Sequence, residues 1–535
     1  MSNKRSLLLK TLSFLRTHSV IFTFVCVTFI FHFINLFHLG PTWDDWYYPE
    51  NFNKQLWSFD PDFDSFSTGY GLGGFTLIDA LAKLVTGNIS FYSEDNFTSL
   101  VARRTILLIL SYLGALATYG VARNLGYSSA MAKIAALLLL TLPNWVGQAS
   151  INIKDIPVAV GLIFLADAFV RVLVLKTIKV SKRTRSLVLV EVFIGFYLSF
   201  GTRFGLIAFI LVATAILFLA NKRINKIKTG ISNLSLAISM MLSYLMLLPL
   251  NPILINPIKF VPKAIFGTLN LYQQSAGPVL TNGVFIDGNN PPAWYLPTWT
   301  FAQLPLTHLC LLLIGIPAIA YQLKHFSIPW IKRNTVTLSA LIIFTLMTLA
   351  PYLTAILLSP PLYDGDRQFL MAYPFFVLMM LGGINHLKKA KMNYGEANIT
   401  RFLIATLCLS PGVAVVSSTP YTYSFRNEMI RFPEKWEGDY MGVSFRKAAE
   451  STIKLDYQLA YDFSDERWLV KWNQANLGIS SVVESEQFLY IATRRGVRNS
   501  LPEECAEIQN IETRFLGREN IMSFVAICNV ERVGK

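Results

Sequence analysis

Charged residues are scarce in this chain. Only 15% of its 535 residues are Asp, Glu, Lys or Arg, whereas 53% are hydrophobic. Soluble globular proteins normally carry about 25% charged residues, and the mean hydropathy of this chain is +0.44. The composition therefore excludes an ordinary soluble protein and is typical of a protein that crosses a membrane several times.

Several common signatures are also missing. Five cysteines are too few for a disulfide scaffold, and the six histidines are scattered without the spacing of metal ligands. The chain has no P-loop, no Gly-x-Ser-x-Gly motif and no pair of Cys-x-x-Cys motifs. We also expect no cleavable signal peptide, because no small-residue cleavage site follows the first apolar run at 18–39.

Long apolar runs, by contrast, are abundant. They predict an all-α polytopic membrane protein with about eleven spanning helices. The expected spans are 20–39, 104–122, 134–148, 156–175, 187–200, 204–220, 231–250, 309–323, 335–358, 368–386 and 401–417. Gly201, Thr202 and Arg203 interrupt the 187–220 region, so one kinked span is the alternative there.

The distribution of basic residues predicts the orientation in the membrane. The net charge is +14, but the basic residues gather in short loops between apolar runs, which favours cytoplasmic loops over nucleic-acid binding. The alternate loops at 40–103, 149–155, 201–203, 251–308 and 359–367 are longer and hold far fewer Lys and Arg. We therefore expect a cytoplasmic N-terminus, these loops outside, and a C-terminal tail outside after eleven spans.

The composition divides the chain into two expected domains. Residues 1–417 form the transmembrane domain, and 418–535 form a small extracytoplasmic α/β domain in which charges become frequent and no span follows. One helix and three strands are expected there, at Val443–Ile453, Gln458–Phe463, Gln487–Thr493 and Met522–Val530. Cys505 and Cys528 both fall in this domain, and both a disulfide and two separate thiols remain open.

The two long outer loops carry further local patterns. In the loop 40–103, Glu50–Phe59 is expected to form an interfacial helix, and glycines at 69–74 precede an apolar helix at Phe75–Val85. Those glycines favour close helix packing or a turn over a dinucleotide site, which needs a preceding strand. In the loop 251–308, Asn289–Tyr295 predicts a turn with aromatic rings that anchor the interface or stack on a sugar.

The most informative motif is the acidic pair Asp44-Asp45, just after the first apolar run. Its neighbours include Trp43, Trp46 and Tyr47, and apolar rings beside a carboxylate favour its protonated form, which suits a general base. Two carboxylates also suit a divalent ion. The alternative is a solvated helix end without chemistry.

Three basic residues fall on the same predicted side. Lys154 stands beside Asp155 at the start of a span, where a cation is unfavourable unless an anion such as phosphate is bound. Arg203 lies between two apolar runs, and Arg367 has the planar fork that grips phosphate oxygens. We expect them to line one cavity together with the acids on that side, a set that spans more than 300 positions: Asp44, Asp45, Asp155, Asp364 and Asp366. The alternatives are a helix cap by Asp155 and a local ion pair from Arg367 to Asp364 or Asp366.

These motifs resemble the GT-C superfamily of membrane glycosyltransferases, which includes protein O-mannosyltransferases and the aminoarabinose transferases of lipid A. The likeness covers about residues 40–450. It rests on the acidic pair in the first outer loop and on four further stretches, at 152–157, 363–369, 420–423 and 439–446. Two positions depart from the family pattern: the pair is Asp-Asp where Asp-Glu is common, and Gln368 stands where His is expected.

The resemblance implies sugar transfer from a polyprenyl-phosphate donor to a hydroxyl acceptor, a glycan, lipid or protein, with inversion. The implied catalytic residues, which would also hold a metal ion if one is used, are Asp44, Asp45 and Asp155. The implied phosphate-binding residues are Lys154, Arg203 and Arg367. The residues expected to shape the substrate site are Trp43, Tyr47, Tyr363, Asp364 and Asp366. No cofactor is required, and a divalent cation is compatible with these acids.

Two other functions compete with this hypothesis. The first is a transporter or a flippase for lipid-linked sugars. Charges at the membrane midplane and inverted repeats would favour it, and the sequence shows neither. An inactive relative would use its tail to bind a partner. The expected location is a bacterial inner membrane, and the expected partners are the lipid donor, the acceptor and the bilayer, without nucleic acid.

Overall fold

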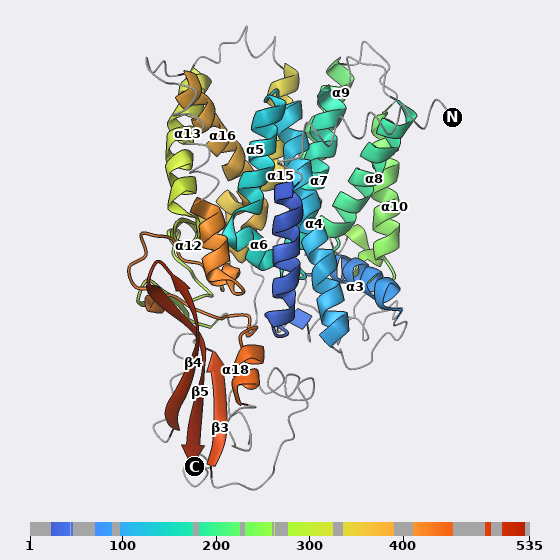
Figure 1. The fold of residues 1–535 in the computed structure, drawn as a ribbon. Coiled ribbons are helices and arrows are strands. Elements are labelled where there is room, and N and C mark those ends of the chain that lie inside the picture. The colour runs from blue at the N-terminus through green and yellow to red at the C-terminus, as the bar shows by residue number, and fades with distance from the viewer. Residues whose placement is uncertain are drawn as a thin grey trace, which may run out of the picture.

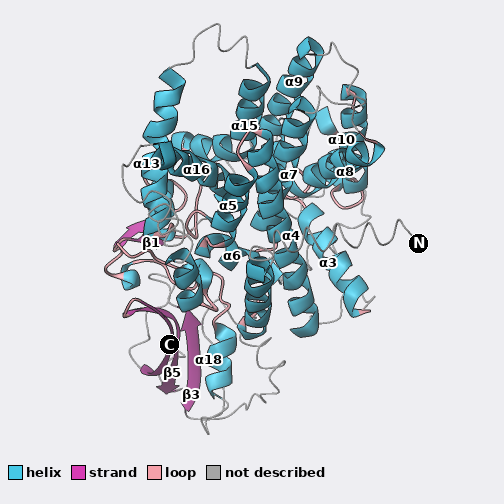
Figure 2. Ribbon diagram, turned by 45° about the horizontal axis from the view of Figure 1, so that its top comes forward, coloured by secondary structure: helices cyan, strands magenta, loops and turns pink. Residues whose placement is uncertain are grey.

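The computed structural model describes residues 23–42, 44–45, 70–87, 97–174, 181–224, 231–258, 260, 262, 277–324, 335–389, 410–452, 487–493 and 505–529. Helices form a bundle, and a small sheet near the C-terminus projects from one end of it (Figure 1). Figure 2 shows the same division, with β3 and β5 at that end and β1 nearer to α13.

The described helices and strands follow in chain order. The α-helices are α3 (Gly73–Thr86), α4 (Phe97–Asn124), α5 (Ser129–Leu140), α6 (Pro143–Ala149), α7 (Asp155–Val174), α8 (Lys182–Ser199), α9 (Ile207–Ile224), α10 (Asn233–Leu247), α12 (Tyr295–Gln303), α13 (Leu306–Lys324), α15 (Thr335–Leu358), α16 (Tyr373–Lys389) and α18 (Phe445–Thr452). Residues 23–35 and 410–418 are also α-helical. Short 3-10 helices are η1 (Leu36–His38), η3 (Phe204–Leu206), η4 (Pro252–Ile255), η5 (Arg367–Ala372), η6 (Thr422–Ser424) and η7 (Pro433–Lys435). The strands are β1 (Val279–Thr281), β2 (Val284–Ile286), β3 (Gln487–Thr493), β4 (Cys505–Phe515) and β5 (Arg518–Asn529).

Helix α7 is the central element of the bundle. It packs against α4, α8 and α15, and 89% of its most apolar 18-residue stretch is buried inside the protein. A helix that is apolar all round is stable only in such a buried place or in lipid. The start of α7, with Asp155 as its first residue and Lys154 just before it, is therefore held by neighbours on several sides.

Five helices in the described part of the chain are long and apolar enough to cross a membrane, or six if one bent pair counts as a single span. They begin at Phe97, Asp155, Phe204, Thr335 and Arg367. The predominantly helical membrane-type fold is thus confirmed, whereas the count of eleven spans stays a prediction. The last of the expected spans, 401–417, lies only partly within the described residues.

Serine caps begin three of the helices. Ser128, Ser181 and Ser232 each accept a hydrogen bond from the backbone amide three residues later, at the starts of α5, α8 and α10. Such caps satisfy an amide that has no partner within the helix. They fix where the apolar segments begin.

The expected span 134–148 is wrong as a continuous helix. The structure breaks it into α5 and α6, which meet at an angle of 64°. Pro143 stands at the first position of α6, where its missing amide hydrogen is tolerated, but it cannot continue α5. The break directs α6 toward the loops that form the site.

The 187–220 region forms two helices, α8 and α9, with Gly201, Thr202 and Arg203 between them. The glycines at 71, 73 and 74 lie against this turn. A Cβ at Gly73 would come within 2.9 Å of the backbone of Gly201, and one at Gly74 within 2.6 Å of the Thr202 hydroxyl. The prediction of close packing at these glycines is confirmed, and so is the helix that follows them.

The C-terminal strands form an antiparallel sheet in the order β3-β5-β4. The predicted strand Gln487–Thr493 and helix near Val443–Ile453 are confirmed as β3 and α18, and β5 contains most of Met522–Val530. Strand β4 and the short hairpin β1-β2 were not predicted. The predicted strand Gln458–Phe463 and the interfacial helix Glu50–Phe59 lie outside the described residues.

A second hydrophobic core joins this region to the bundle. It includes Leu36 and Leu39 after the first helix, Val443 beside α18, and Met522 and Val525 of β5. The amide of Gly40 donates to the carbonyl of Val443 over 2.8 Å. Cys505 and Cys528 form a disulfide across β4 and β5, which settles the alternative left open by the sequence.

Candidate functional site

The loop before α7 places a lysine and an aspartate side by side. The carbonyl oxygen of the Asn152 side chain accepts hydrogen bonds from the amides of Lys154 and Asp155, over 3.2 and 2.8 Å. Asn152 therefore occupies the amides at the start of α7, a role that the sequence offered to Asp155. The Asp155 carboxylate is left to bind other groups.

Asp155 joins two arginines from distant parts of the chain. Its Oδ1 accepts from Arg203 Nη2 over 2.5 Å, and its Oδ2 accepts from Arg367 Nη1 over 3.2 Å. Asn152 Nδ2 donates to the same Oδ2 over 2.8 Å. Because Asp155 is 1% exposed, both of its oxygens depend on these partners for their hydrogen bonds.

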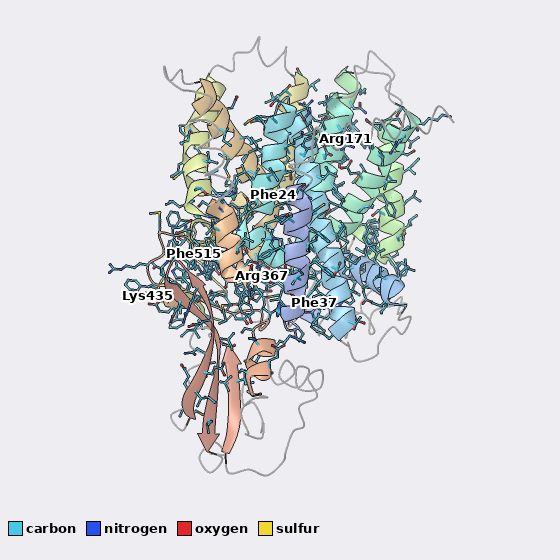
Figure 3. The ribbon with its side chains drawn as sticks, viewed as in Figure 1. Phe24, Phe37, Arg171, Arg367, Lys435 and Phe515 are labelled. Carbon is cyan, nitrogen blue, oxygen red and sulfur yellow. A yellow bond between two sulfur atoms is a disulfide. The ribbon has the colours of Figure 1, made fainter. Side chains whose placement is uncertain are left out.

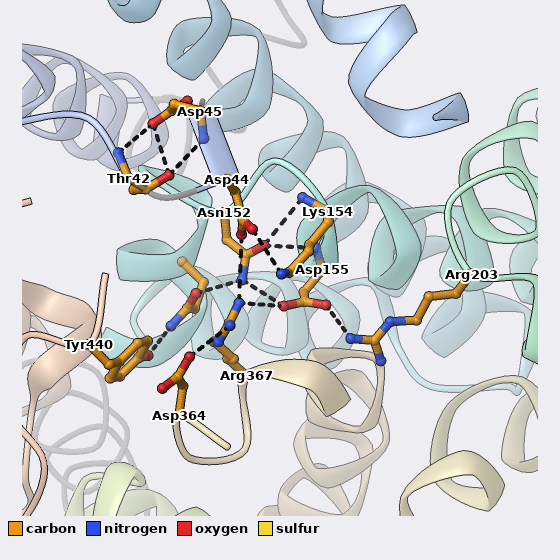
Figure 4. Close-up of polar contacts among 11 residues, drawn as sticks. Thr42, Asp44, Asp45, Asn152, Lys154, Asp155, Arg203, Asp364, Arg367 and Tyr440 are labelled. Carbon is orange, nitrogen blue, oxygen red and sulfur yellow. Dashed lines mark hydrogen bonds and ion pairs between the residues drawn. The ribbon is translucent and has the colours of Figure 1, made fainter. Parts of the chain in front are cut away.

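Asp44 lies on the other side of the same cluster (Figure 4). Its Oδ1 accepts from Lys154 Nζ over 2.9 Å, and its Oδ2 lies 3.9 Å from Arg367 Nη1. Among the described residues this Oδ2 is buried and has no hydrogen-bond partner. A buried carboxylate oxygen that lacks a donor is unusual and marks a place where a further group would bind.

Asp45 faces away from this cluster. Its Oδ2 accepts from the amide and the hydroxyl of Thr42, over 2.8 and 2.9 Å, and from Arg104 Nη2 over 3.1 Å. Arg104 is fully buried and also donates to the carbonyls of Leu39 and Gly40. The two adjacent acids therefore have different surroundings, as Figure 4 shows for Asp44 and Asp45.

Arg367 begins η5 and is shared among several partners. Its Nη2 donates to Asp364 Oδ2 over 2.8 Å, which is one of the local ion pairs expected from the sequence. Asp364 and Gly365 have positive φ angles of 58° and 76°, so a tight turn brings this carboxylate back onto the guanidinium. The rings of Tyr363 and Tyr440 lie 5.2 and 5.7 Å from the guanidinium carbon.

Tyr70 covers the opposite end of the cluster. Its ring centroid lies 5.6 Å from Lys154 Nζ and 5.4 Å from the Arg203 guanidinium carbon. Residues 70 and 203 also form an isolated antiparallel bridge. The aromatic residues at both ends limit the access of water and strengthen the electrostatic interactions between the charged groups.

A polar chain connects the C-terminal region to the site. Gln148 Nε2 of α6 donates to Tyr440 OH over 2.6 Å, and Asn152 Nδ2 donates to Gln148 Oε1 over 2.8 Å. Sequence reasoning quoted the stretch around Tyr440 but gave it no role, and it missed Gln148. The available signal was the pair of amide side chains, Asn144 and Gln148, within a mostly apolar run.

Asp366 belongs to a separate polar network. It accepts hydrogen bonds from Asn144 Nδ2 at 2.8 Å, Thr300 Oγ1 at 2.8 Å and Tyr373 OH at 2.9 Å. Burial raises the pKa of Asp366 to about 6, although the hydroxyls of Thr300 and Tyr373 act in the opposite direction. This network pins the start of α6 to α12 and α16, so it supports the site from outside.

The remaining predicted site residues have mixed outcomes. Trp43 and Tyr47 lie outside the described residues. Lys154, Asp155, Arg203, Asp364 and Arg367 come together with Asp44, as the shared sidedness predicted. Within the described part of the chain, no three His, Cys, Asp or Glu side chains gather as metal ligands, and metal binding stays a prediction.

No family model and no curated protein matches this sequence. The chain is similar to the solved structure of ArnT from Cupriavidus metallidurans in the apo state, with 9% identity, a TM-score of 0.51, and 95% of this chain and 98% of that chain covered. This chain has the fold of ArnT. The GT-C fold expected from the sequence is thereby confirmed. A sequence identity of 9% supports a shared fold and gives no information on activity.

Two weaker likenesses were found. ArnT from the same organism bound to undecaprenyl phosphate has 10% identity and a TM-score of 0.45, with the same coverage. The oligosaccharyltransferase of Archaeoglobus fulgidus, tethered with an acceptor peptide, has 13% identity and a TM-score of 0.48. That comparison covers 83% of this chain and 58% of the oligosaccharyltransferase.

Proposed function

We propose that this protein is a membrane glycosyltransferase. It transfers a sugar from a polyprenyl-phosphate donor to a hydroxyl group on a glycan, a lipid or a protein. Support comes from the fold shared with ArnT, an aminoarabinose transferase, and from helices apolar enough to cross a membrane. The loops that hold the site residues are poor in Lys and Arg, whereas the short loops that alternate with them are rich in both. This difference supports a site on the extracytoplasmic face of a bacterial inner membrane.

The observation that carries the proposal is the environment of Asp44. One oxygen of this buried carboxylate binds Lys154, and the other has no hydrogen-bond partner in the described chain. An acceptor hydroxyl can donate to this second oxygen, which is the geometry required of a general base. Arg367 lies close enough to bind an anion on the same side.

Lys154, Arg203 and Arg367 are assigned to the donor phosphate. Each of these cations is paired with a carboxylate. A phosphate that binds them takes over part of this pairing, and Lys154 then moves its contact from Asp44 to the phosphate. Asp155 keeps the two arginines together and acts through them, while Asp364 orients Arg367.

The transfer step conserves atoms and charge. The acceptor hydroxyl gives its proton to Asp44, and its oxygen forms a bond to the anomeric carbon from the face opposite the phosphate. The bond between that carbon and the phosphate oxygen breaks, and its electron pair leaves with the polyprenyl phosphate. The cations stabilise the charge that develops on this leaving group, and the anomeric configuration inverts.

Substrate contacts and metal use complete the proposal. Trp43, Tyr47 and Tyr363 are assigned to the walls of the sugar site, and Asp366 is assigned an indirect effect through α6. Asp44, Asp45 and Asp155 are the acids that would hold a divalent cation, and we propose that the step runs without one. Activity is therefore expected to survive a chelator.

The test is turnover of a polyprenyl-phosphate sugar by the purified full-length protein in lipid nanodiscs. The readouts are release of polyprenyl phosphate and the mass of the glycosylated acceptor. We expect Asp44→Asn to lower kcat by about 10²–10⁴, the usual contribution of a general base. Asp79→Asn is the matched control, because it removes a largely buried carboxylate that binds Lys83 and Arg103 outside the cluster.

Two results would overturn the assignment. Full activity of Asp44→Asn would exclude Asp44 as the base while leaving the donor sites open. Movement of the lipid-linked sugar across the membrane without any bond breakage would replace the transferase with a transporter or flippase.

A further inference from the structure

Three segments far apart in the sequence meet beside the start of α13. The amide of Gly283, in the β1-β2 turn, donates to the carbonyl of Lys435 over 2.7 Å. Arg518, after the β4-β5 turn, donates to backbone carbonyls of residues 427, 428 and 430. The Glu428 carboxylate accepts from the amide of Leu306, the first residue of α13, over 2.8 Å. These bonds hold the β1-β2 turn, the β4-β5 turn and residues 427–435 together.

Large apolar side chains cover the outside of this place. Five of them are between 44% and 66% exposed, namely Val284, Phe285, Met429, Phe432 and Leu516. Single exposed hydrophobic residues are common on protein surfaces and need no explanation. Five on three segments that are bonded to one another form a patch, and such patches mark contacts with a partner or a membrane.

Two exposed cations flank the central ring of the patch. Lys435 Nζ lies 4.7 Å and the Arg431 guanidinium carbon 5.3 Å from the ring centroid of Phe432. Long basic side chains that lay their stems on apolar surface while their charges reach outward are typical of membrane interfaces. Glu434 is also exposed here, so two exposed cations, Arg431 and Lys435, stand beside one exposed acid.

The patch continues the apolar side of the bundle. Leu313 and Ile316 of α13 are large, exposed and apolar, and α13 begins at the residue that Glu428 holds. Figure 1 shows the β4-β5 turn next to α12 and the lower end of α13, and Figure 3 places Phe515 and Lys435 at the margin of the molecule on that side. An apolar surface with aromatic rings and cations, found at the end of apolar helices, has the composition of an interfacial belt.

We propose that this patch rests in the headgroup layer of the membrane. The apolar side chains of β2, of the β4-β5 turn and of Met429 and Phe432 enter the boundary between headgroups and acyl chains. Arg431 and Lys435 contact lipid phosphates. The C-terminal sheet is thereby held at the membrane surface by its tip, and this anchoring does not depend on the proposed transferase activity.

The test uses the full-length protein in nanodiscs, with Cys26, Cys310 and Cys408 replaced by Ser. A bimane label is attached at Phe432→Cys or, in a second protein, at Leu516→Cys. Lipids that carry a spin label near the headgroup end of the acyl chain serve as the quencher. The label at Leu313→Cys is the lipid-facing reference, and the label at Ile508→Cys, an exposed apolar position far along β4, is the matched control.

We expect the quenching at positions 432 and 516 to be comparable with that at 313, and the label at 508 to keep its fluorescence. Absence of quenching at both positions 432 and 516 would overturn the proposal. Cross-linking of two protomers through these positions, without quenching, would instead identify a second copy as the occupant. Either result would leave the proposed transferase function untouched.

Discussion

Asp44 and Asp45 are neighbours in the chain, but their carboxylates bind different cations, Lys154 and Arg104. The first acid has an oxygen without a hydrogen-bond partner among the described residues, and the second closes a turn against a fully buried arginine. Their substitution should therefore have different physical effects, although the sequence presents them as one pair.

Asp45→Asn should act on stability. The change removes the charge that compensates buried Arg104, and breaking a buried ion pair costs about 3–5 kcal/mol. We expect a lower Tm in detergent and, at a temperature where the protein stays folded, a smaller loss of kcat than in Asp44→Asn. A Tm equal to that of the unmodified protein, with kcat abolished, would instead make Asp45 the base.

Lys154→Gln should act mainly on donor binding. A hydrogen bond to a charged group contributes about 1.5–3 kcal/mol, so the KM for the polyprenyl-phosphate sugar should rise about tenfold or more. Lys83→Gln is the matched control, because Lys83 also pairs with an aspartate, Asp79, over 2.6 Å. An unchanged donor KM in Lys154→Gln would remove the lysine from the phosphate site.

Asp155→Asn should affect both stability and catalysis. The amide cannot balance Arg203 and Arg367, which converge on this buried carboxylate. We expect a lower Tm and loss of most turnover, measured on the same preparation as the unmodified protein. If the variant binds and turns over the donor normally, the two arginines do not need Asp155 to hold their positions.

Asp366 should make stability depend on pH. Burial raises its pKa to about 6 from 3.8, so the folded protein holds this proton more tightly than the unfolded chain. The folded state then binds more protons between those values, and stability falls as the pH rises through that window. The fall contributed by Asp366 is about 3 kcal/mol, since one pKa unit corresponds to about 1.4 kcal/mol.

The measurement compares the Tm of the unmodified protein and of Asp366→Asn at about pH 4 and about pH 7. Other titrating groups contribute alike to both proteins, so their difference isolates Asp366. The Asn variant should lose less stability as the pH rises. Parallel pH profiles for the two proteins would show that Asp366 keeps an ordinary pKa.

Sidedness was the strongest sequence signal for the site. Counting basic residues in loops placed Asp44, Lys154, Arg203 and Arg367 on one face, and the structure joins them through Asp155 and direct ion pairs. The count works because apolar spans leave few choices for where a charge can lie. It contains no information on which carboxylate meets which cation.

The missed features depend on contacts beyond the local pattern. Strand β4 is exposed over most of its length and lacks a clean apolar alternation, and its pairing with β5 decides its structure. The break between α5 and α6 was signalled by Pro143, within a run that is mostly apolar. The separation of Asp44 from Asp45 depends on Arg104, which lies 59 positions after Asp45.

The cluster around Asp155 combines three carboxylates, Asp44, Asp155 and Asp364, with three basic side chains, Lys154, Arg203 and Arg367. Opposite charges so close together cancel at a distance, so the cluster projects little field beyond its own contacts. If the proposed donor binds here, its anionic headgroup would not be steered toward the cluster from afar. The rate at which the proposed donor reaches the cluster should then respond weakly to ionic strength.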